Sequence, residues 1–598
     1  MNKIKRLRNL MRTSGVAAYI VPGTDPHASE YMAAHWMEMQ WLSGFTGEAG
    51  TLVVTLDDAG LFTDSRYYLQ ADIELKDTGI TLMRASDIDC PSVEEWLISR
   101  LKANDIVAVN SEMWSVNDYE TLLASFLNHD ISVKNIDLIA PLWTDSRPPI
   151  PSSLLYPYDE KYAGESVEDK LNRIRQTMAK HNADALIISA LDEIAWLLNI
   201  RGNDVEYNPV VISYLLLEKE HCTLFINSAK IDETAHRYLS SLHIIVREYT
   251  EVYPALSALH GSVMLDPARV NEALFAALPE RTRIIKEQSP VLIDKSRKNP
   301  IELEGERKAM KQDAVALTRF FKWLEEKMAN MRTDNGLRLT EWDLMEQLHE
   351  FRLQGENFIE ESFGTIAGYK GNGAIVHYAA TPDNCATIHP EGMLLLDSGG
   401  QYLDGTTDIT RTVWLGGDIP QQAKLDYTYV LKGHIALARA RFPLGTRGNQ
   451  IDALAKQYMW QAGITYGHGT GHGVGHFLGC HEGPQNIRTD MNPTQLQPGN
   501  ICSDEPGIYR TGQWGIRIEN LVAVQDEPTT EAATTNDRFL SFETLTLCYY
   551  DTSLIEITLL TDDEKQWLND YHRRVADTIC PLLTSDEASW LRQKCKDI

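Results

Sequence analysis

Two acidic residues, Asp397 and Asp408, stand where one short hairpin would bring their side chains together. The apolar run 393–396 predicts a buried strand that ends at Asp397, and turn-forming residues follow before the strand that carries Asp408. With the turn centred between Tyr402 and Leu403, the two carboxylates occupy neighbouring positions on adjacent strands. Because an ionised carboxylate out of water is costly unless it is paired or binds a metal, this pair predicts a cation site.

A second acidic pair repeats this arrangement further along the chain. Glu505 and Glu519 are symmetric about Gly512, the centre of a second turn, so a hairpin would again set two carboxylates side by side. Between the pairs, residues 467–484 form a glycine-rich stretch with four histidines: His468, His472, His476 and His481. Four carboxylates and one imidazole suit two divalent ions about 3.5 to 4 Å apart, the spacing at which a water between them becomes a nucleophile.

A turn cap is the alternative for any single aspartate at the end of a strand, and it is the commoner role. Two symmetric acid hairpins that flank a histidine-rich loop are harder to explain in this way, so the sequence favours a metal centre. His476 falls outside the ligand pattern and is expected to be a surface or loop residue.

The same residues resemble those of a known family. Asp397, Asp408, His472, Glu505 and Glu519 match, in order and in local context, the five metal ligands of the pita-bread metallopeptidases, which include methionine aminopeptidase, prolidase and aminopeptidase P. The surrounding phrases GAIVHY, DGTTDITRT, GHGTGHGVG, HEGP and DEPGIY look like the large, three-domain Xaa-Pro aminopeptidase branch. This resemblance covers nearly the whole chain. It implies hydrolysis of the bond between an N-terminal residue and a following proline, by a water that two metal ions activate.

The resemblance also implies catalytic roles. His377 and His481 would bind substrate and stabilise the charge that develops on the carbonyl oxygen. Taken alone, His377 would more often be a core or strand histidine. Glu505 is both a ligand candidate and the best candidate to accept the water's proton, and pure ligation is an equally good interpretation of it.

Three further residues are expected near the site. By resemblance, Arg66 is the substrate-binding arginine of the first domain, whereas from spacing alone it would be a surface cation. His468 precedes His472 by four residues in a loop where the backbone can approach closely, so we expect it to line the site and contact substrate. Arg517 shares a strand face with Glu519 and could orient a ligand carboxylate from behind.

The sequence does not name the metal. Carboxylate-rich sites with one histidine accept Mn²⁺, Co²⁺ or Zn²⁺, and the resemblance favours Mn²⁺. The closest alternative function is that of prolidase, a dipeptidase that usually has one domain before the catalytic one. A metal-free peptide- or protein-binding module on the same fold and creatinase-like metal-free hydrolysis are further alternatives, which five intact ligand positions disfavour.

Composition limits the classes of function. The chain has 598 residues, 43% of them hydrophobic, and a formal net charge of −28. Such a charge repels nucleic acid. No stretch approaches 18 apolar residues, which excludes a predicted membrane span, and eight cysteines without a CxxC pair favour a reducing cytoplasm. We therefore expect a cytoplasmic enzyme that binds peptides with proline at the second position and, by resemblance, forms a homodimer.

The elements that must position the site fall into three predicted domains, an α/β and α+β fold. Residues 1–150 and 151–298 each alternate helix and strand, and they loosely echo one another, with a proline-rich linker near residues 148–157. By resemblance both are creatinase-like. Residues 299–598 form the pita-bread catalytic domain, with an extension from about 530. In it we expect helices at 420–441 and 450–461 and strands at 375–376, 545–549 and 554–560.

Overall fold

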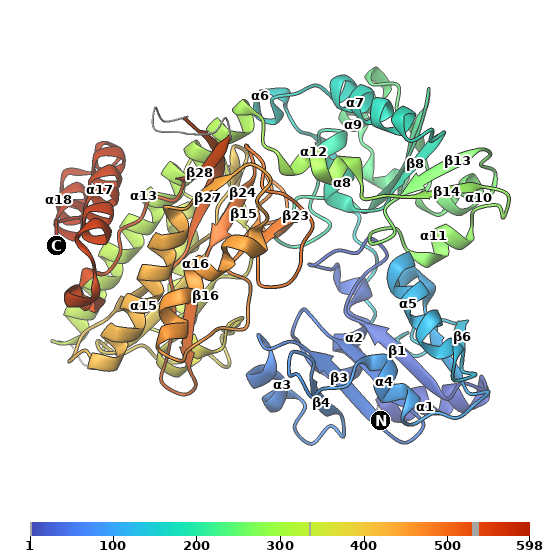
Figure 1. Ribbon diagram of the computed structural model, residues 1–598, viewed down its shortest axis with the longest axis horizontal. Helices are drawn as coiled ribbons and strands as arrows, with labels where there is room; N and C mark the ends of the chain where they lie inside the picture. The colour runs from blue at the N-terminus through green and yellow to red at the C-terminus, as the bar shows by residue number, and fades with distance from the viewer. Residues whose placement is uncertain (1–2, 334–335, 529–537) are drawn as a thin grey trace. The chain divides into compact units, whose positions relative to one another are not determined.

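The computed structural model describes residues 3–333, 336–528 and 538–598. The chain divides into two compact units, Met1–Asp294 and Lys295–Ile598 (Figure 1). The predicted boundaries between three domains stay a prediction, and the predicted start of the extension, near residue 530, lies outside the described residues. Within the three described ranges, no helix is both long and apolar enough to pass through a bilayer.

The first unit contains two six-stranded sheets. The strands of one are β1 (Ala18–Pro22), β2 (Thr51–Thr55), β3 (Ala59–Thr63), β4 (Thr81–Arg84), β5 (Ile106–Val109) and β6 (Ser132–Asn135). Those of the other are β8 (Ala185–Ile188), β10 (Ser213–Glu218), β11 (Cys222–Ile226), β12 (Ile245–Arg247), β13 (Ser262–Leu265) and β14 (Arg283–Lys286). A small pair, β7 (Tyr156–Pro157) and β9 (Ile200–Arg201), accompanies them.

The two sheets share one topology. Their strand orders are β4-β3-β2-β1-β5-β6 and β12-β11-β10-β8-β13-β14. In each sheet the first strand is antiparallel to the second and parallel to the strand on its other side, β5 or β13. The echo that the sequence predicts between the two halves is therefore present in the strand pairing.

Helices connect these strands in the first unit. They are α1 (Lys3–Thr13), α2 (Glu38–Ser43), α3 (Tyr68–Glu74), α4 (Val93–Ile98), α5 (Val116–Leu127), α6 (Glu160–Ala163), α7 (Val167–Lys180), α8 (Leu191–Leu197), α9 (Glu233–Ser241), α10 (Val252–Ser257) and α11 (Glu272–Ala276), and α12 (Pro290–Ser296) crosses the boundary to the second unit. Ile4, Leu7 and Met11 are buried along one face of α1, as their spacing predicts. Ser166 caps α7 by accepting the N–H of Asp169.

The second unit begins with the 32-residue helix α13 (Pro300–Met331), capped by Asn299 at the predicted start. Its other helices are α14 (Glu341–Arg352), α15 (Gln421–Ala438), α16 (Gly448–Gln461), α17 (Asp562–Ile579) and α18 (Ser585–Lys594). Its strands are β15 (Phe358–Glu361), β16 (Ile366–Tyr369), β17 (Met393–Ser398), β18 (Gly400–Tyr402), β19 (Gly405–Thr406), β20 (Ile409–Trp414), β21 (Arg441–Pro443), β22 (Gly471–Gly473), β23 (Glu482–Ile487), β24 (Ile501–Asp504), β25 (Gly507–Arg510), β26 (Trp514–Arg517), β27 (Asn520–Glu527) and β28 (Phe539–Thr544).

Four sheets organise these strands. Two have three strands, β15-β18-β19 and β16-β17-β20; one has six, β21-β28-β27-β24-β22-β23; and β25 pairs with β26. Helices α15 and α16 confirm the two helices predicted at 420–441 and 450–461 within a few residues.

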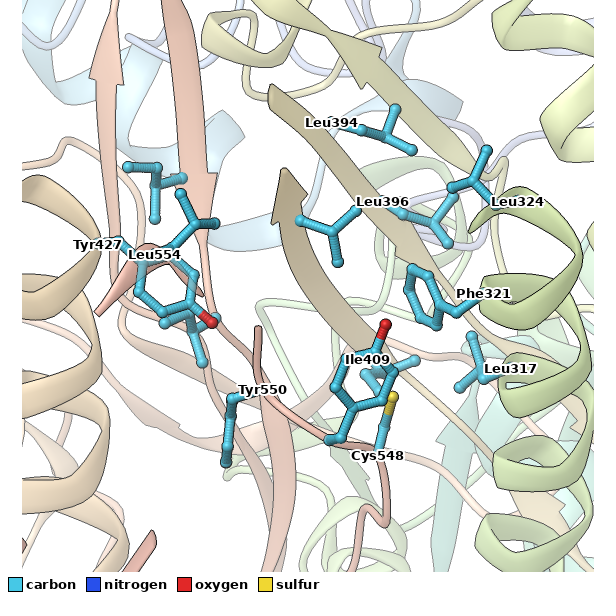
Figure 2. Close-up of a cluster of buried hydrophobic side chains, with 14 of the residues drawn as sticks. Leu317, Phe321, Leu324, Leu394, Leu396, Ile409, Tyr427, Cys548, Tyr550 and Leu554 are labelled. Carbon is cyan, nitrogen blue, oxygen red and sulfur yellow. The ribbon is translucent and has the colours of Figure 1, made fainter. Parts of the chain in front are cut away.

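The core of this unit holds the first acid hairpin in place. Leu317, Phe321 and Leu324 of α13 share one buried cluster with Leu396 and Ile409 of β17 and β20 (Figure 2). Because side chains alternate along a strand, burying Leu396 on this face turns its neighbour in sequence toward the opposite face. The hydrophobic core thereby decides which way the first acidic residue points.

Three predicted strands are wrong. Ile375 and Val376 lie in a turn that follows the 3₁₀ helix η5 (Lys370–Ala374). Residues 545–549 carry no strand, and residues 554–560 include the 3₁₀ turns η6 (Thr552–Leu554) and η7 (Ile557–Leu559). Short apolar runs do not distinguish a strand from an irregular segment. Residues 545–549 are buried without forming a strand, and in residues 554–560 the two 3₁₀ turns leave Ile557 45% exposed.

Candidate metal centre

The first hairpin differs from the prediction by one residue in its turn. In β17 and β20, Asp397 lies opposite Thr410, and in β18 and β19, Tyr402 lies opposite Gly405. The turn is thus centred one residue later than expected, and Asp408 is not directly opposite Asp397. It lies two positions from Thr410, and because the side-chain period of a strand is two, both carboxylates still share one face.

The second hairpin has the predicted register. Asp504 of β24 lies opposite Asn520 of β27, and β25 and β26 continue the same pairing. Gly512 forms the turn with φ of +73°, a conformation that favours glycine. This register places Glu505 opposite Glu519, as predicted.

All five predicted ligands meet in one cluster. Candidate ligand atoms of Asp397, Asp408 and Glu519 lie within 4.8 Å of one another, and so do those of His472, Glu505 and Glu519. The two groups share Glu519. Two overlapping groups with a shared carboxylate are the arrangement that a pair of bridged cations requires.

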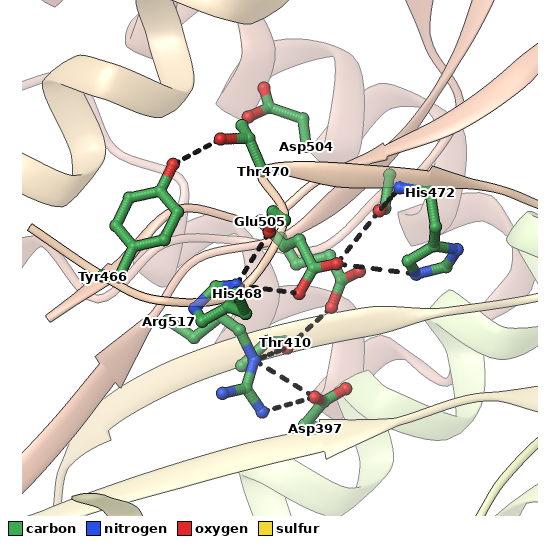
Figure 3. A network of polar contacts seen from close by, with 12 residues as sticks. Asp397, Thr410, Tyr466, His468, Thr470, His472, Asp504, Glu505 and Arg517 are labelled. Atoms are coloured by element: carbon green, nitrogen blue, oxygen red, sulfur yellow. Dashed lines mark hydrogen bonds and ion pairs between the residues drawn. The ribbon is translucent and has the colours of Figure 1, made fainter. Parts of the chain in front are cut away.

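Two buried oxygens of this cluster point to a cation. Oδ1 of Asp397 and Oε1 of Glu519 are buried without a hydrogen-bond partner among the described residues. The other oxygen of each is held. Arg517 donates to Oδ2 of Asp397 at 2.5 Å (Figure 3). Thr410 donates to Oε2 of Glu519 at 2.7 Å. A buried acceptor without a partner costs about 1–3 kcal/mol, so these oxygens fit metal ligation well.

His472 is oriented for ligation by its backbone surroundings. Its Nδ1 donates to the carbonyl of Gly473 at 2.9 Å, so Nε2 carries the free lone pair. That atom lies 3.3 Å from Oδ2 of Asp408 and 3.6 Å from Oε1 of Glu505. Ser503 accepts the backbone N–H of His472 at 2.9 Å and donates to Glu505 at 3.2 Å, which ties the two ligands together.

The electrostatics of the cluster favour a bound cation. Burial, with the repulsion of the neighbouring acids, raises the pKa of Glu505 to about 7 and that of Glu519 well above its ordinary value. Burial also raises the pKa of Asp397, against the opposing charge of Arg517. Burial would raise that of Asp408 too, but its contacts with His472, His481 and Cys480 together outweigh this and lower its pKa. Without a cation, Glu505 and Glu519 therefore retain protons that metal binding would displace.

A hydrogen-bonded chain connects the cluster to His468. Arg517, which holds Asp397, also donates from Nη1 to the hydroxyl of Tyr509 at 2.8 Å. The Tyr509 hydroxyl lies 2.8 Å from Nε2 of His468, whose Nδ1 contacts the carbonyl of Gly469 at 2.7 Å. Since a carbonyl only accepts, His468 is protonated at Nδ1, and Tyr509 donates to its Nε2. The structure thus brings His468 and Arg517 beside the site, where the sequence predicts them.

The two predicted substrate histidines are placed differently. His481 joins the cluster, because its ligand atom lies within 4.8 Å of those of Asp408 and His472, and its ring meets that of His472 edge-on at 4.3 Å. His377 is half-buried in the turn after η5 and belongs to none of the ligand groups found among the described residues. Its predicted substrate role stays a prediction.

Arg66 and His476 lie in different units. Arg66, in the first unit, forms a two-point ion pair with Asp64, at 2.8 Å from Nε and 2.7 Å from Nη2, and its side chain is 28% exposed. His476, expected to be a surface or loop residue, lies in a loop but is buried against Glu306, with its Nδ1 3.2 Å from the carboxylate. Glycine-rich sequence around His476 suggests an exposed loop, but here it lets the loop pack closely.

Most of the residues that hold the ligands were not predicted, although the sequence contains a signal for two of them. Ser503 and Thr410 each stand two residues from a ligand on the same strand face, as Arg517 does. Cys480, whose thiol donates to Oδ2 of Asp408 at 3.3 Å, and Tyr509 reach the site from loop or strand positions that carry no comparable pattern.

Comparisons with known proteins agree with this geometry. Models of the creatinase/prolidase N-terminal domain match residues 3–140 and 146–302, the metallopeptidase family M24 model matches residues 304–526, and a model of the C-terminal region of peptidase M24 matches residues 538–598. Xaa-Pro aminopeptidase 1 from Dictyostelium discoideum is 38% identical over 615 residues, which cover 100% of this chain and 96% of that protein. The chain belongs to the Xaa-Pro aminopeptidase family.

Solved structures of the family support the fold. The crystal structure of X-prolyl aminopeptidase from Caenorhabditis elegans, described as a cytosolic enzyme with a di-nuclear active site, is 33% identical. It superposes with a TM-score of 0.94 and covers 100% of this chain and 99% of its own. Xaa-Pro dipeptidase from Bacillus anthracis, 20% identical with a TM-score of 0.50, covers 98% of its own chain but 64% of this one. The predicted fold class, two creatinase-like α/β domains followed by a pita-bread domain, is confirmed.

Proposed function

We propose that this Xaa-Pro aminopeptidase family member hydrolyses the bond between an N-terminal residue and a following proline, using two divalent cations. The observation that carries this proposal is the cluster of four carboxylates and one imidazole, in which buried oxygens of Asp397 and Glu519 lack a protein partner. The di-nuclear active site reported for the Caenorhabditis elegans relative supports the same stoichiometry. A metal-free binding module would have no need to bury these acids together.

The protein's own residues have separable roles in this proposal. Two cations in the cluster would lower the pKa of a water toward neutrality and polarise the scissile carbonyl. Glu505, whose Oε1 lies 3.6 Å from Nε2 of His472, accepts the water's proton. His481, beside Asp408 and His472, and His377 bind the substrate and stabilise negative charge on its carbonyl oxygen. His468, fixed by Tyr509, lines the substrate side of the site.

Selectivity for proline follows from the chemistry of its amide. An X-Pro bond has no N–H, so enzymes that recognise that group fail on it. A pocket shaped for the rigid pyrrolidine ring gains affinity at a small entropic cost. Arg66 of the first unit is proposed to bind the free carboxylate of a short substrate.

We propose Mn²⁺ as the metal, because the donor set is rich in hard oxygen ligands, with Co²⁺ and Zn²⁺ as alternatives. Assignment to the cytoplasm and assembly as a homodimer belong to the same proposal. The cytosolic description of the Caenorhabditis elegans relative supports the first.

A comparison of three peptides tests the proposed function against the dipeptidase alternative. The metal-loaded protein should cleave Ala-Pro-Ala much faster than Ala-Pro, and Ala-Ala-Ala should be a poor substrate. A preference for Ala-Pro would instead identify a dipeptidase, and equal cleavage of Ala-Ala-Ala would refute proline selectivity.

A further inference from the structure

Glu341, the first residue of α14, is a fully buried carboxylate to which the proposed reaction assigns no role. It belongs to none of the ligand groups found among the described residues. Every hydrogen-bond donor that reaches it in the described part of the chain is an uncharged group. A carboxylate away from water is costly unless hydrogen bonds satisfy it, so the origin of these donors shows what the residue holds in place.

The donors come from the segment that carries His377. Oε1 of the carboxylate accepts the backbone N–H of Tyr369 at 2.8 Å and the side-chain amide of Asn372 at 3.0 Å. Oε2 accepts the hydroxyl of Tyr378 and the backbone N–H of Ala386, both at 2.7 Å. Two of these residues precede His377 in the sequence and two follow it. One side chain therefore fixes the segment on both sides of the histidine.

The turn that contains His377 is closed by its own hydrogen bonds. The N–H of Ile375 donates to the carbonyl of Asn372 at 3.0 Å, and the N–H of Tyr378 donates to the carbonyl of Ile375 at 3.1 Å. The side-chain amide of Asn372 also donates to the hydroxyl of Tyr378 at 3.0 Å. Because Asn372 and Tyr378 both donate to Glu341 as well, the carboxylate joins the two ends of this turn.

The same segment packs closely against the second acid hairpin. A Cβ on Gly515 of β26 would lie 1.6 Å from the carbonyl oxygen of Gly373, so the two backbones are in direct contact there. Gly515 lies in the hairpin between the ligands Glu505 and Glu519. The turn thus rests on the backbone that connects two metal ligands, and Glu341 holds its ends.

We propose that Glu341 is a positioning residue, which holds His377 in place to contact the carbonyl oxygen of the substrate. This inference rests on the substrate role proposed above for His377. Glu341 acts through the turn rather than by contact with the substrate. The position requires two accepting oxygens: a glutamine, whichever way its amide faced, would turn an NH₂ group toward the backbone N–H of Tyr369 or of Ala386.

Hydrogen exchange in the full-length, Mn²⁺-loaded protein tests whether the carboxylate holds the turn. Glu341→Gln should raise the exchange rate of the backbone amides in residues 369–386 by roughly tenfold or more, because local opening becomes easier. Asp343→Ala is the matched control, since Asp343 is exposed and accepts the N–H of Thr340 at the start of the same helix, at 2.8 Å. It should leave exchange in this segment unchanged. Equal exchange in wild type and Glu341→Gln would overturn the proposal.

A double-mutant cycle with Ala-Pro-Ala as substrate tests whether His377 is the residue that Glu341 positions. Glu341→Gln and His377→Ala should each lower kcat/KM by roughly tenfold or more, while each variant still binds two Mn²⁺ per chain. Adding Glu341→Gln to His377→Ala should lower kcat/KM by less than about threefold further, because an absent side chain cannot be mispositioned. If the two losses multiply in the double variant, Glu341 supports another part of the site and the proposal is wrong.

Tyr378→Phe takes the place of Glu341→Gln in both experiments if that variant fails to fold. It removes one donor to the carboxylate and keeps the ring, so both effects should be smaller but of the same kind. If the wild type fails to hydrolyse Ala-Pro-Ala, the proposed function fails, whereas hydrogen exchange still decides whether Glu341 holds the turn.

Discussion

Each of the four carboxylates in the cluster is held at one oxygen by a neighbouring side chain. The donors to Asp397, Asp408, Glu505 and Glu519 are, in the same order, Arg517, Cys480, Ser503 and Thr410. Fixing one oxygen of each acid orients the other without neutralising all of the negative charge. The residues around the ligands thus orient the carboxylates for metal binding in the metal-free protein.

Glu505 should make the metal-free protein sensitive to pH. Its folded pKa of about 7 exceeds its ordinary value of 4.5, so its contribution to stability is complete below pH 4.5 and is lost as the pH rises through 7. Glu505→Gln does not titrate. We therefore measure the free energy of unfolding in urea for both proteins without metal. The value for the variant minus the value for wild type should increase by about 2 to 3 kcal/mol between pH 4.5 and 8.

Saturating metal should remove this pH dependence, because a bound cation stabilises the ionised carboxylate. If the metal-free wild type and Glu505→Gln differ in stability by the same amount at pH 4.5 and at pH 8, Glu505 does not have an elevated pKa.

Arg66 should matter for short substrates. Its replacement by alanine removes a charged hydrogen bond worth about 1.5–3 kcal/mol, so kcat/KM for a free-acid tripeptide X-Pro-Y should fall roughly ten- to a hundredfold. Metal content should not change, and the effect should shrink for the C-terminally amidated peptide. Arg84→Ala, which breaks a similar ion pair with Asp72 at 3.0 Å, is the control. Equal kcat/KM for wild type and Arg66→Ala would reduce Arg66 to the partner of Asp64.

At the scale of elements, the glycine-rich histidine loop allows strands to approach each other closely. A Cβ on Gly471 would lie 2.0 Å from the carbonyl oxygen of Ser503, whereas one on Gly469 would meet only the flexible side chain of Arg488, at 2.8 Å. Gly471 adjoins His472 in β22. The close approach of β22 and β24 therefore sets the distance between His472 and the second acid hairpin.

Gly471→Ala should push these strands apart. We expect a loss of about 1–3 kcal/mol in the free energy of unfolding, as for overpacked cores. Mn²⁺ affinity, measured by calorimetry, should fall at least tenfold. Gly469→Ala should change both by much less. If Gly471→Ala and Gly469→Ala bind Mn²⁺ with similar affinity, the spacing between β22 and β24 does not position His472.

Helix α17 supports the metal-binding strands through one buried arginine. Arg411 of β20 donates from Nη1 to the carbonyls of Thr410 and Glu519, at 3.0 and 2.6 Å. Its Nη2 donates to the carbonyl of Cys548 at 2.8 Å and to the hydroxyl of Tyr571 on α17 at 3.1 Å. The residues that follow the metal hairpins in sequence thereby fix the backbone of one ligand.

Tyr571→Phe removes this support. The variant should lose about 1–3 kcal/mol of stability, because buried partners are left unpaired, and Mn²⁺ should bind several-fold more weakly. Tyr238→Phe, which loses a hydroxyl contact to Leu198 of 3.0 Å in the other unit, should lose stability without losing metal affinity. Equal metal affinity in the two variants would make the α17 contact purely structural.

The ligand cluster was predictable from the sequence for two reasons. Glu505 and Glu519 are symmetric about the turn at Gly512, and side chains along a strand alternate between its two faces, so residues two apart share a face. The first turn was placed one residue early, since several turn-formers follow Asp397 and the sequence does not choose among them. The contacts of Cys480 and of the buried His476 depend on tertiary packing, which no local pattern encodes.

For the whole molecule, two duplicated sheets precede a unit that contains all five predicted ligands. The metal centre is therefore built within Lys295–Ile598, from hairpins that its own core positions. The first unit, by contrast, is proposed to contribute Arg66 to substrate binding. One part of substrate recognition is thus assigned to a different unit from the chemistry.

Titration of the metal-free protein with Mn²⁺, with binding measured by calorimetry and Ala-Pro-Ala hydrolysis measured at each addition, tests the central claim most directly. The account predicts two ions per chain, no hydrolysis before metal is added, and activity that rises as the sites fill. Asp408→Ala should remain folded and inactive, while Asp418→Ala, which changes an exposed acid, should behave as wild type. Full hydrolysis by protein shown to contain no metal, or by Asp408→Ala with stoichiometric metal, would contradict it.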